Sequence, residues 1–146
     1  MMRVFWDICV YRDIEAFISQ DWSITAPDFD ESRFLGIHAH NSNNPADWTP
    51  QFTTLESYQK SFSKQAREFA KLTFAPRYDA HSALYKSLKL ESANIQGDIA
   101  LLTKVFDGDL ILATGEVEAM AWRSLFQFRN SNGRWLITGF VGYLPL

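Results

Sequence analysis

The sequence lacks most of the short motifs that identify a reaction. It contains no glycine-rich phosphate loop, no cysteine pair spaced for zinc and no serine in a nucleophile elbow. The single cysteine, Cys9, excludes an internal disulfide framework and is typical of a reducing compartment. We expect Cys9 to lie in the core as a small hydrophobic residue.

Long hydrophobic runs and excess positive charge are also missing. No apolar run approaches the ~18 residues of a membrane span, and Asp7 and Arg12-Asp13 interrupt the only stretch that resembles a signal peptide. The formal net charge is −3, which argues against nucleic acid or an anionic membrane as a partner. These absences predict a soluble, cytoplasmic protein.

The chain has enough apolar material for one domain over residues 1–146. Of its 146 residues, 47% are hydrophobic and 15% are aromatic. A chain of this length buries roughly 70% of its unfolded surface, so it needs neither disulfides nor a metal to form a core.

Two hydrophobic periodicities divide the chain. A period of 3 to 4 residues predicts helices over 4–20 and from Thr53-Thr-Leu-Glu56 to about Lys71, with a short helix after Asp21. A period of two then predicts strands, with turns at Gln96-Gly97-Asp98 and Asp107-Gly108-Asp109. The predicted strands are 33–40, 83–95, 99–106, 110–113, and a terminal hairpin within 121–146 that turns at 130–133.

This order predicts an α+β, cystatin-like roll. A curved, mostly antiparallel sheet would be wrapped by two to three N-terminal helices. Helices that lean on a curved sheet cannot close on it everywhere, so we expect a cone-shaped cavity at the open end.

The segments DFDESRFLGIHAHNSNNPADW and WRSLFQFRNSNGRWLITGFVGYLP resemble the nuclear transport factor 2-like superfamily, which includes ketosteroid isomerase, scytalone dehydratase and SnoaL-like proteins. The resemblance covers nearly the whole chain and implies a fold more than an activity, because this fold hosts enzymes, adaptors and ligand binders. It also implies a homodimer joined through the outer face of the sheet.

His38 and His40 are the first candidate catalytic residues. Residues i and i+2 of a strand project to one face, so both imidazoles face the cavity if that face is inward. Histidine can act as general acid or base near neutral pH, and scytalone-dehydratase-like proteins use pocket histidines. The alternative is that one or both lie on the rim, bonded to the Asn-rich loop.

A metal site at His38 and His40 is the less favoured reading. A cupin-like site needs a glutamate shortly after the second histidine, where the chain has Asn43 and Asn44. The third histidine, His81, is distant in sequence. We therefore predict no metal and no cofactor.

Carboxylates and phenols provide further candidates. The carboxylate base of a ketosteroid isomerase would fall within Gly36–His40, where none occurs, so histidine would have to replace it. Tyr11 could polarise a carbonyl if it lies on the inward side of the first helix. Glu116 and Glu118 would face the cavity on an unbroken strand, but a break near Gly115 would leave them on a solvated loop, which we favour.

The ligand expected for such a cavity is small and apolar or aromatic. Tryptophan and tyrosine suit its lining because their N–H and O–H groups need partners. The sequence therefore predicts a small-molecule-binding domain and, if the ligand is turned over, a cofactor-free isomerase, dehydratase or cyclase that acts by proton transfer. A non-catalytic dimeric adaptor is the alternative, and the predicted ligand-binding residues are Trp22, Trp122, Ser124 and Tyr143.

Overall fold

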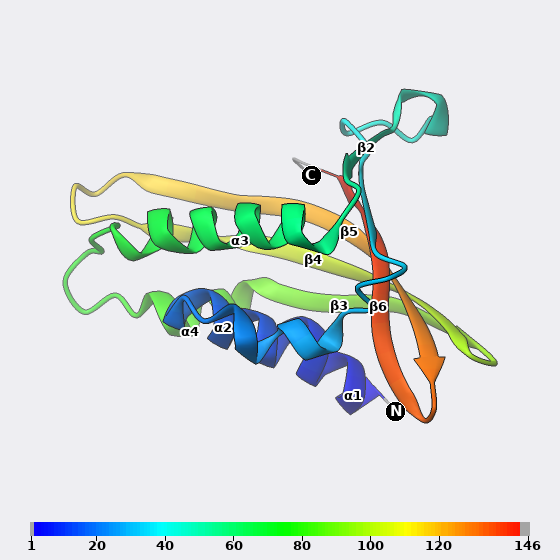
Figure 1. Ribbon diagram of the computed structural model, residues 1–146. Coiled ribbons are helices and arrows are strands. Elements are labelled where there is room, and N and C mark those ends of the chain that lie inside the picture. The colour runs from blue at the N-terminus through cyan, green and yellow to red at the C-terminus, as the bar shows by residue number, and fades with distance from the viewer. Residues whose placement is uncertain (1, 144–146) are drawn as a thin grey trace.

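Six strands form one sheet with the order β2-β1-β6-β5-β4-β3 in the computed structural model, which describes residues 2–143 (Figure 1). Neighbouring strands are antiparallel except for β1 and β6, which are parallel. The predicted α+β architecture with a mostly antiparallel sheet is confirmed. The strands are β1 (Leu35–His38), β2 (Thr49–Phe52), β3 (Leu88–Gln96), β4 (Ile99–Ile111), β5 (Val117–Ser131) and β6 (Arg134–Tyr143).

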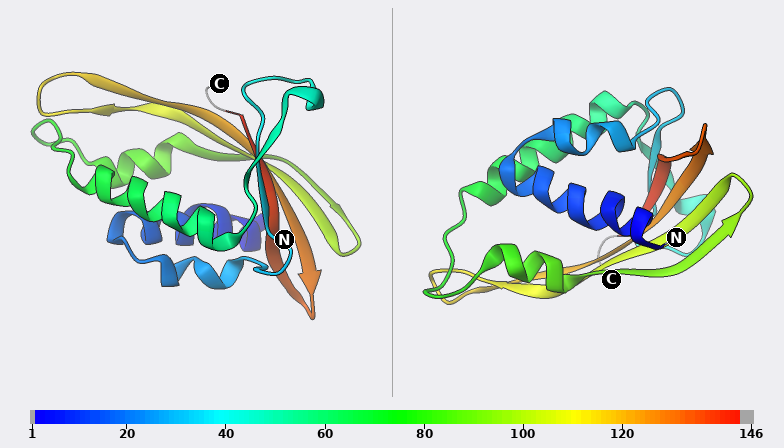
Figure 2. Two further views of the ribbon diagram at one scale, coloured as in Figure 1. Left: turned by 45° about the horizontal axis from the view of Figure 1, so that its top comes forward. Right: turned by 90° about the horizontal axis from the view of Figure 1, so that it is seen from below.

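The helices cover one face of this sheet, and Figure 2 shows the sheet curving beneath them. The N-terminal helix is continuous but changes type, from α1 (Met2–Trp6) through the π-helical η1 (Asp7–Arg12) to α2 (Asp13–Ser19). The other helices are α3 (Leu55–Ala70), α4 (Ala80–Ser87) and the 3-10 segments η2 (Trp22–Ile24), η3 (Ala26–Asp28) and η4 (Pro45–Asp47). No helix in the described residues is long and apolar enough to span a membrane.

Side-chain caps fix where the helices begin. Thr54 Oγ1 accepts a hydrogen bond from the Ser57 N–H at 3.1 Å, so α3 is capped one residue later than the predicted Thr53–Glu56 box. Asp79 caps α4 in the same way, through the Ser82 N–H at 3.1 Å. The first residues of the strand predicted over 83–95 are therefore helical, and that prediction is wrong up to residue 87.

Strand β4 runs straight through the predicted turn at Asp107-Gly108-Asp109. The glycine has a packing role instead, because a Cβ at Gly108 would lie 2.0 Å from the Ser87 Oγ. Glycine inside a strand often marks such a close approach of another segment. Here it lets the end of α4 pack directly onto β4.

The apolar core lies between the helices and the sheet. Phe5, Cys9 and Phe128 are almost completely buried there, and the rings of Phe5 and Phe128 meet edge to face at 4.9 Å. Burial raises the pKa of the Cys9 thiol to about 12, so the thiol stays protonated. Cys9 therefore occupies the core position that its sequence context predicts.

Candidate functional site

A cavity of about 620 Å³ lies between the helices and the inner face of the sheet. Its walls come from α2, α3, α4 and the strands β1, β2, β4, β5 and β6. Most lining side chains are apolar or aromatic, including Phe62 of α3 and the neighbouring rings of Phe106 and Trp122, which are 4.8 Å apart. This composition is typical of small-molecule pockets.

Polar side chains cross the sheet in one row on the cavity floor. His38 of β1 pairs with Gly142 of β6, Gly142 pairs with Ser124 of β5, and Ser124 pairs with Lys104 of β4. All four residues line the cavity, together with Asp13 of α2. The row thus brings together groups that lie far apart in the sequence.

Lys104 forms an ion pair with Asp13 in this cavity. The Lys104 Nζ lies 2.9 Å from the Asp13 Oδ2 and 5.2 Å from the centre of the Phe126 ring. Lys104 is only 8% exposed, and lysine is rarely this buried without a partner. The pair is the strongest polar feature inside the cavity.

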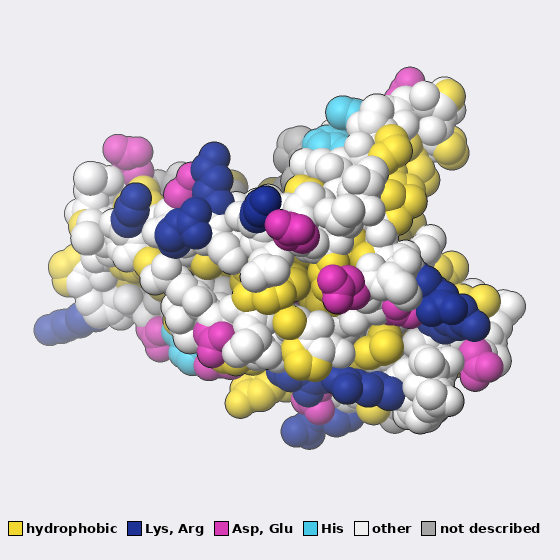
Figure 3. Space-filling model, viewed as in Figure 1, with side chains coloured by type: hydrophobic (Ala, Val, Ile, Leu, Met, Phe, Trp, Pro, Cys, Tyr) yellow, Lys and Arg dark blue, Asp and Glu magenta, His cyan; other side chains and the backbone are white. Residues whose placement is uncertain are grey.

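The two candidate histidines do not share the cavity. Strand β1 ends at His38, and His40 follows in a turn with a left-handed φ of 54°. His38 lines the cavity, whereas His40 is exposed and its Nε2 lies 2.8 Å from the Thr49 Oγ1. The expectation that both project to one inward strand face is therefore corrected for His40, which lies on the rim loop. Figure 3 shows histidine side chains beside the projecting β1–β2 segment.

Tyr11 also lies outside the cavity, contrary to the expected inward orientation. It is 49% exposed and stacks on Trp6 at 6.2 Å. Val10 is buried on the same side of the helix as Ile14, whereas Tyr11, in the π-helical segment η1, lies on the exposed side. Beyond this segment, Asp13 lines the cavity.

The two predicted tryptophans have different places. Trp122 lines the cavity as expected, but Trp22 is not among the described residues that line it. Trp22 instead packs into the aromatic core, 5.2 Å from Phe62 and 5.4 Å from Phe29. Its predicted role as a lining residue is corrected.

Ser124 lines the cavity, whereas Tyr143 lies on the opposite face of the sheet. A register shift between Gln127 and Phe128 in the β5–β6 pairing reverses which residues of β6 face inward. Tyr143 consequently packs on Trp48, and the Arg123 guanidinium lies 5.0 Å from its ring centre. This corrects the prediction that Tyr143 contacts a ligand.

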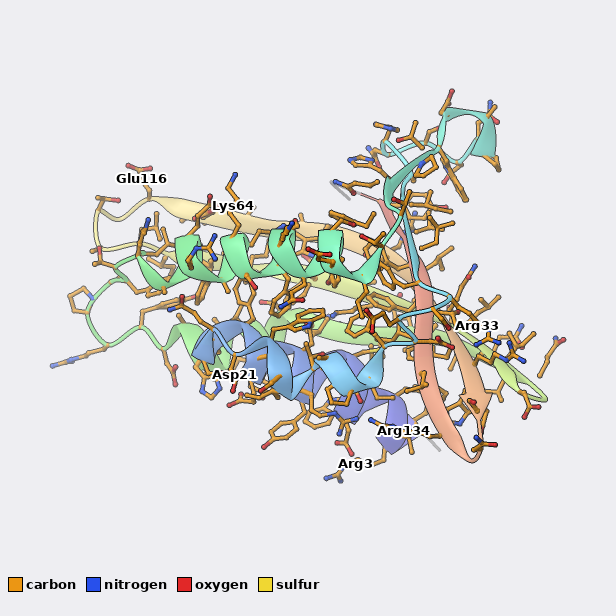
Figure 4. All side chains as sticks on the ribbon, in the orientation of Figure 1. Arg3, Asp21, Arg33, Lys64, Glu116 and Arg134 are labelled. Atoms are coloured by element: carbon orange, nitrogen blue, oxygen red, sulfur yellow. The ribbon has the colours of Figure 1, made fainter. Side chains whose placement is uncertain are left out.

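Glu116 and Glu118, the two candidate glutamates, lie in different environments. The expected break occurs at Gly115, in the turn between β4 and β5, but β5 begins at Val117, so Glu118 is on the strand and lines the cavity while remaining exposed. Glu116 lies before the strand, in the turn at the far end of the β4–β5 hairpin (Figure 4). Lys64, on the outer side of α3, also points away from the cavity in that view.

Asp13, Lys104 and Tyr58 are among the lining residues that sequence reasoning missed. Lys104 had a signal in the sequence, since it lies two residues from both Leu102 and Phe106 and therefore shares their inner face of β4. Burial raises the pKa of the Tyr58 phenol, so Tyr58 stays protonated and can donate a hydrogen bond. Asp13 had no comparable signal. It directly follows a π-helical segment, and periodicity of 3 to 4 residues does not indicate which way such a residue points.

Comparison with solved structures supports one fold assignment. A conserved protein from Planctomyces limnophilus aligns with 99% of this chain and 97% of its own, at 13% identity and a TM-score of 0.60. A nuclear transport factor 2-like protein of unknown function from Shewanella oneidensis aligns over 97% of both chains, at 9% identity and a TM-score of 0.54. The chain has the nuclear transport factor 2-like fold.

Another similar structure is a protein of unknown function from Nostoc punctiforme, described as having a cystatin-like fold. It covers 97% of this chain and 88% of its own, at 14% identity and a TM-score of 0.57. No family model and no curated protein sequence matches the chain. At these identities the nuclear transport factor 2-like fold is shared, while the choice of ligand or reaction depends on the residues of the cavity.

Proposed function

We propose that the protein binds a small, mainly apolar or aromatic molecule in the cavity between its helices and sheet. The volume of about 620 Å³ falls within the range of ordinary ligand pockets. Apolar walls supply binding energy by removing the ligand surface from water, and a few polar groups orient it.

The observation that carries this proposal is the polar row on an otherwise apolar floor. His38, Ser124 and Lys104 occupy paired positions on successive strands, with Gly142 between His38 and Ser124. A cavity that served only as a packing defect would have no reason to hold a serine, a histidine and an ion pair together.

If the ligand is turned over, we propose proton transfer without a cofactor, as in an isomerisation or a dehydration. His38 would serve as acid or base, since it lines the cavity and an imidazole can both accept and donate a proton. The protonated phenol of Tyr58 also lines the cavity and would donate a hydrogen bond to the ligand, which Tyr11 cannot do from the surface. His40, on the rim, is then dispensable for the chemistry.

Displacement of an apolar fluorescent probe tests ligand binding. Ser124→Leu places a larger side chain on the cavity floor, and Gln127→Leu makes a similar change on the exposed, opposite face of the same strand. We expect Ser124→Leu to weaken probe binding about tenfold and Gln127→Leu to leave it unchanged. Equal affinities in all three proteins, or no binding at all, would contradict the proposal.

A non-catalytic adaptor is the alternative function for this fold. An adaptor can fill its cavity with side chains and present a surface groove instead. The open cavity favours ligand binding, because Trp22 packs into the core instead of plugging the space. Saturable binding of the probe, weakened in Ser124→Leu, would decide between the two functions.

We also propose a homodimer joined through the outer face of the sheet. Ile99, Leu101 and Leu125 lie on that face and are 59%, 43% and 36% exposed. Light scattering at several concentrations would test it, with Leu101→Lys/Leu125→Lys expected to be monomeric. Mass unaffected by this double variant would exclude that face. A cytoplasmic location remains a prediction that the single buried Cys9 suits.

A further inference from the structure

The Asp13–Lys104 pair has free hydrogen-bonding capacity toward the cavity. An ammonium group carries three N–H donors, and the hydrogen bond to Asp13 is the one that the described residues accept from Lys104. The Nζ otherwise faces the aromatic rings of Phe126 and Phe106, at 5.2 and 5.8 Å. An acceptor atom that entered the cavity could take a remaining N–H without displacing Asp13.

The charges around the cavity select against anions. Among the described lining residues, Lys104 is the one lysine or arginine, whereas Asp13, Glu68 and Glu118 are acidic. Asp13 neutralises Lys104 at 2.9 Å, and Glu68 and Glu118 are exposed. A ligand carboxylate would therefore be repelled by more charge than attracts it, while a neutral oxygen would lose nothing.

We infer that the Asp13–Lys104 pair is a recognition site for the carbonyl oxygen of a neutral ligand. This inference rests on the proposed ligand-binding function and names the chemical class that the cavity takes. The carbonyl accepts a hydrogen bond from Lys104, and Asp13 holds the Lys104 Nζ in place through its own hydrogen bond at 2.9 Å. The apolar body of the ligand lies along the polar row toward His38, roughly three strand spacings or 14 Å away.

Three probes of matched size test this class. 2-Acetylnaphthalene carries a ketone, 2-naphthoate carries a carboxylate, and 2-isopropylnaphthalene carries neither. Their affinities for the unaltered protein can be measured by calorimetry or by quenching of tryptophan fluorescence. We expect the ketone to bind about tenfold more tightly than the hydrocarbon, the effect of one hydrogen bond to a charged group, and the carboxylate to bind most weakly.

A double variant separates recognition from folding. Asp13→Leu/Lys104→Met removes both charges together, so that neither is left buried alone. Its preference for the ketone over the hydrocarbon should disappear, while the hydrocarbon still binds. The matched control is Glu56→Leu/Lys60→Met, which makes the same chemical change at an exposed pair on α3 and should keep the preference.

The outcomes are distinct. Equal binding of the ketone and the hydrocarbon by the unaltered protein overturns the carbonyl site but leaves the proposed ligand binding intact. Tightest binding of the carboxylate overturns the selection for neutral ligands. A ketone preference that survives in Asp13→Leu/Lys104→Met assigns recognition to other residues and also overturns the inference. Failure of all three probes to bind counts against both the inference and the proposed function.

Discussion

The His38 Nδ1 accepts a hydrogen bond from the backbone N–H of His40 at 2.8 Å, and the two imidazole rings stack at 4.1 Å. This contact forms because the backbone turns back at His40, where φ is 54°. An Nδ1 atom that accepts a hydrogen bond carries no proton, so the neutral His38 ring must hold its proton on Nε2. The rim loop thus determines the tautomer of the one candidate histidine that lines the cavity.

We predict that ¹⁵N NMR spectra at a pH where His38 is neutral show the Nε2–H tautomer for this residue. His40→Gly keeps the backbone N–H and accommodates the positive φ, so it should keep the tautomer despite loss of the stacked ring. A protonated Nδ1 in the unaltered protein would contradict the contact.

The Asp13–Lys104 pair leads to a stability prediction that needs no ligand. The two side chains are 21% and 10% exposed, so removing one partner leaves the other charge poorly solvated. We expect Lys104→Met to lower the free energy of unfolding by about 2 kcal/mol, and Asp13→Leu/Lys104→Met to be close to neutral. Urea denaturation of both variants and of Asp13→Leu completes the cycle. Additive losses would show that the pair is not coupled.

A network between α2 and α4 predicts a dependence of stability on pH. The Glu15 Oε2 accepts hydrogen bonds from His81 Nε2 at 2.8 Å and from Tyr85 Oη at 2.6 Å, and these bonds lower the pKa of Glu15. A lowered folded-state pKa stabilises the protein above the unfolded-state value and ceases to do so as the pH falls through the folded-state value.

We therefore expect Glu15→Gln to lose stability relative to the unaltered protein at pH 7, and the difference to shrink as the pH falls below the ordinary glutamate range. Urea unfolding at several pH values measures this difference. Glu116→Gln, at an exposed turn, is the control and should show no such trend. A constant difference across the pH range would show that charge on Glu15 is not the source.

The close approach of Gly108 and Ser87 predicts a coupled pair of substitutions. A Cβ at Gly108 would also lie 2.8 Å from the Ser87 Cβ, so Gly108→Ala should cost about 2 kcal/mol through overpacking. Ser87→Gly opens the same space, and the double variant Ser87→Gly/Gly108→Ala should recover part of that loss. Thermal unfolding of the three variants measures the coupling, and its absence would place the strain elsewhere.

The fold was predictable because its strongest signals are local. The three- and four-residue spacing of apolar side chains continues along all of helix α3, and the two-residue alternation continues along β5. Both elements occur where the sequence predicts them. The turn at Asn132-Gly133 also occurs as predicted, with both residues at positive φ. Such signals depend on neighbours in the chain, which a single sequence displays.

The candidate site was less predictable because single-residue shifts determine it. Tyr11 lies on the exposed side of the first helix, within its π-helical segment, and one register shift moves Tyr143 to the other face of the sheet. Neither irregularity has a distinct sequence pattern, and a shift of one residue in a strand reverses the face on which a side chain lies. Gly108 is a related case. Asp107-Gly108 has the sequence of a turn, but the glycine is needed because Ser87 packs against it.

Substitution of Gly142 would change the volume of the cavity. It lies between His38 and Ser124 in the polar row, and a Cβ there would meet its nearest neighbours at 3.8 and 3.9 Å, which is ordinary contact. Larger side chains at this position would divide the floor into two compartments while leaving the strand pairing in place. The size of the ligand that we propose could therefore be changed through residue 142 alone, without a change in the surrounding strands.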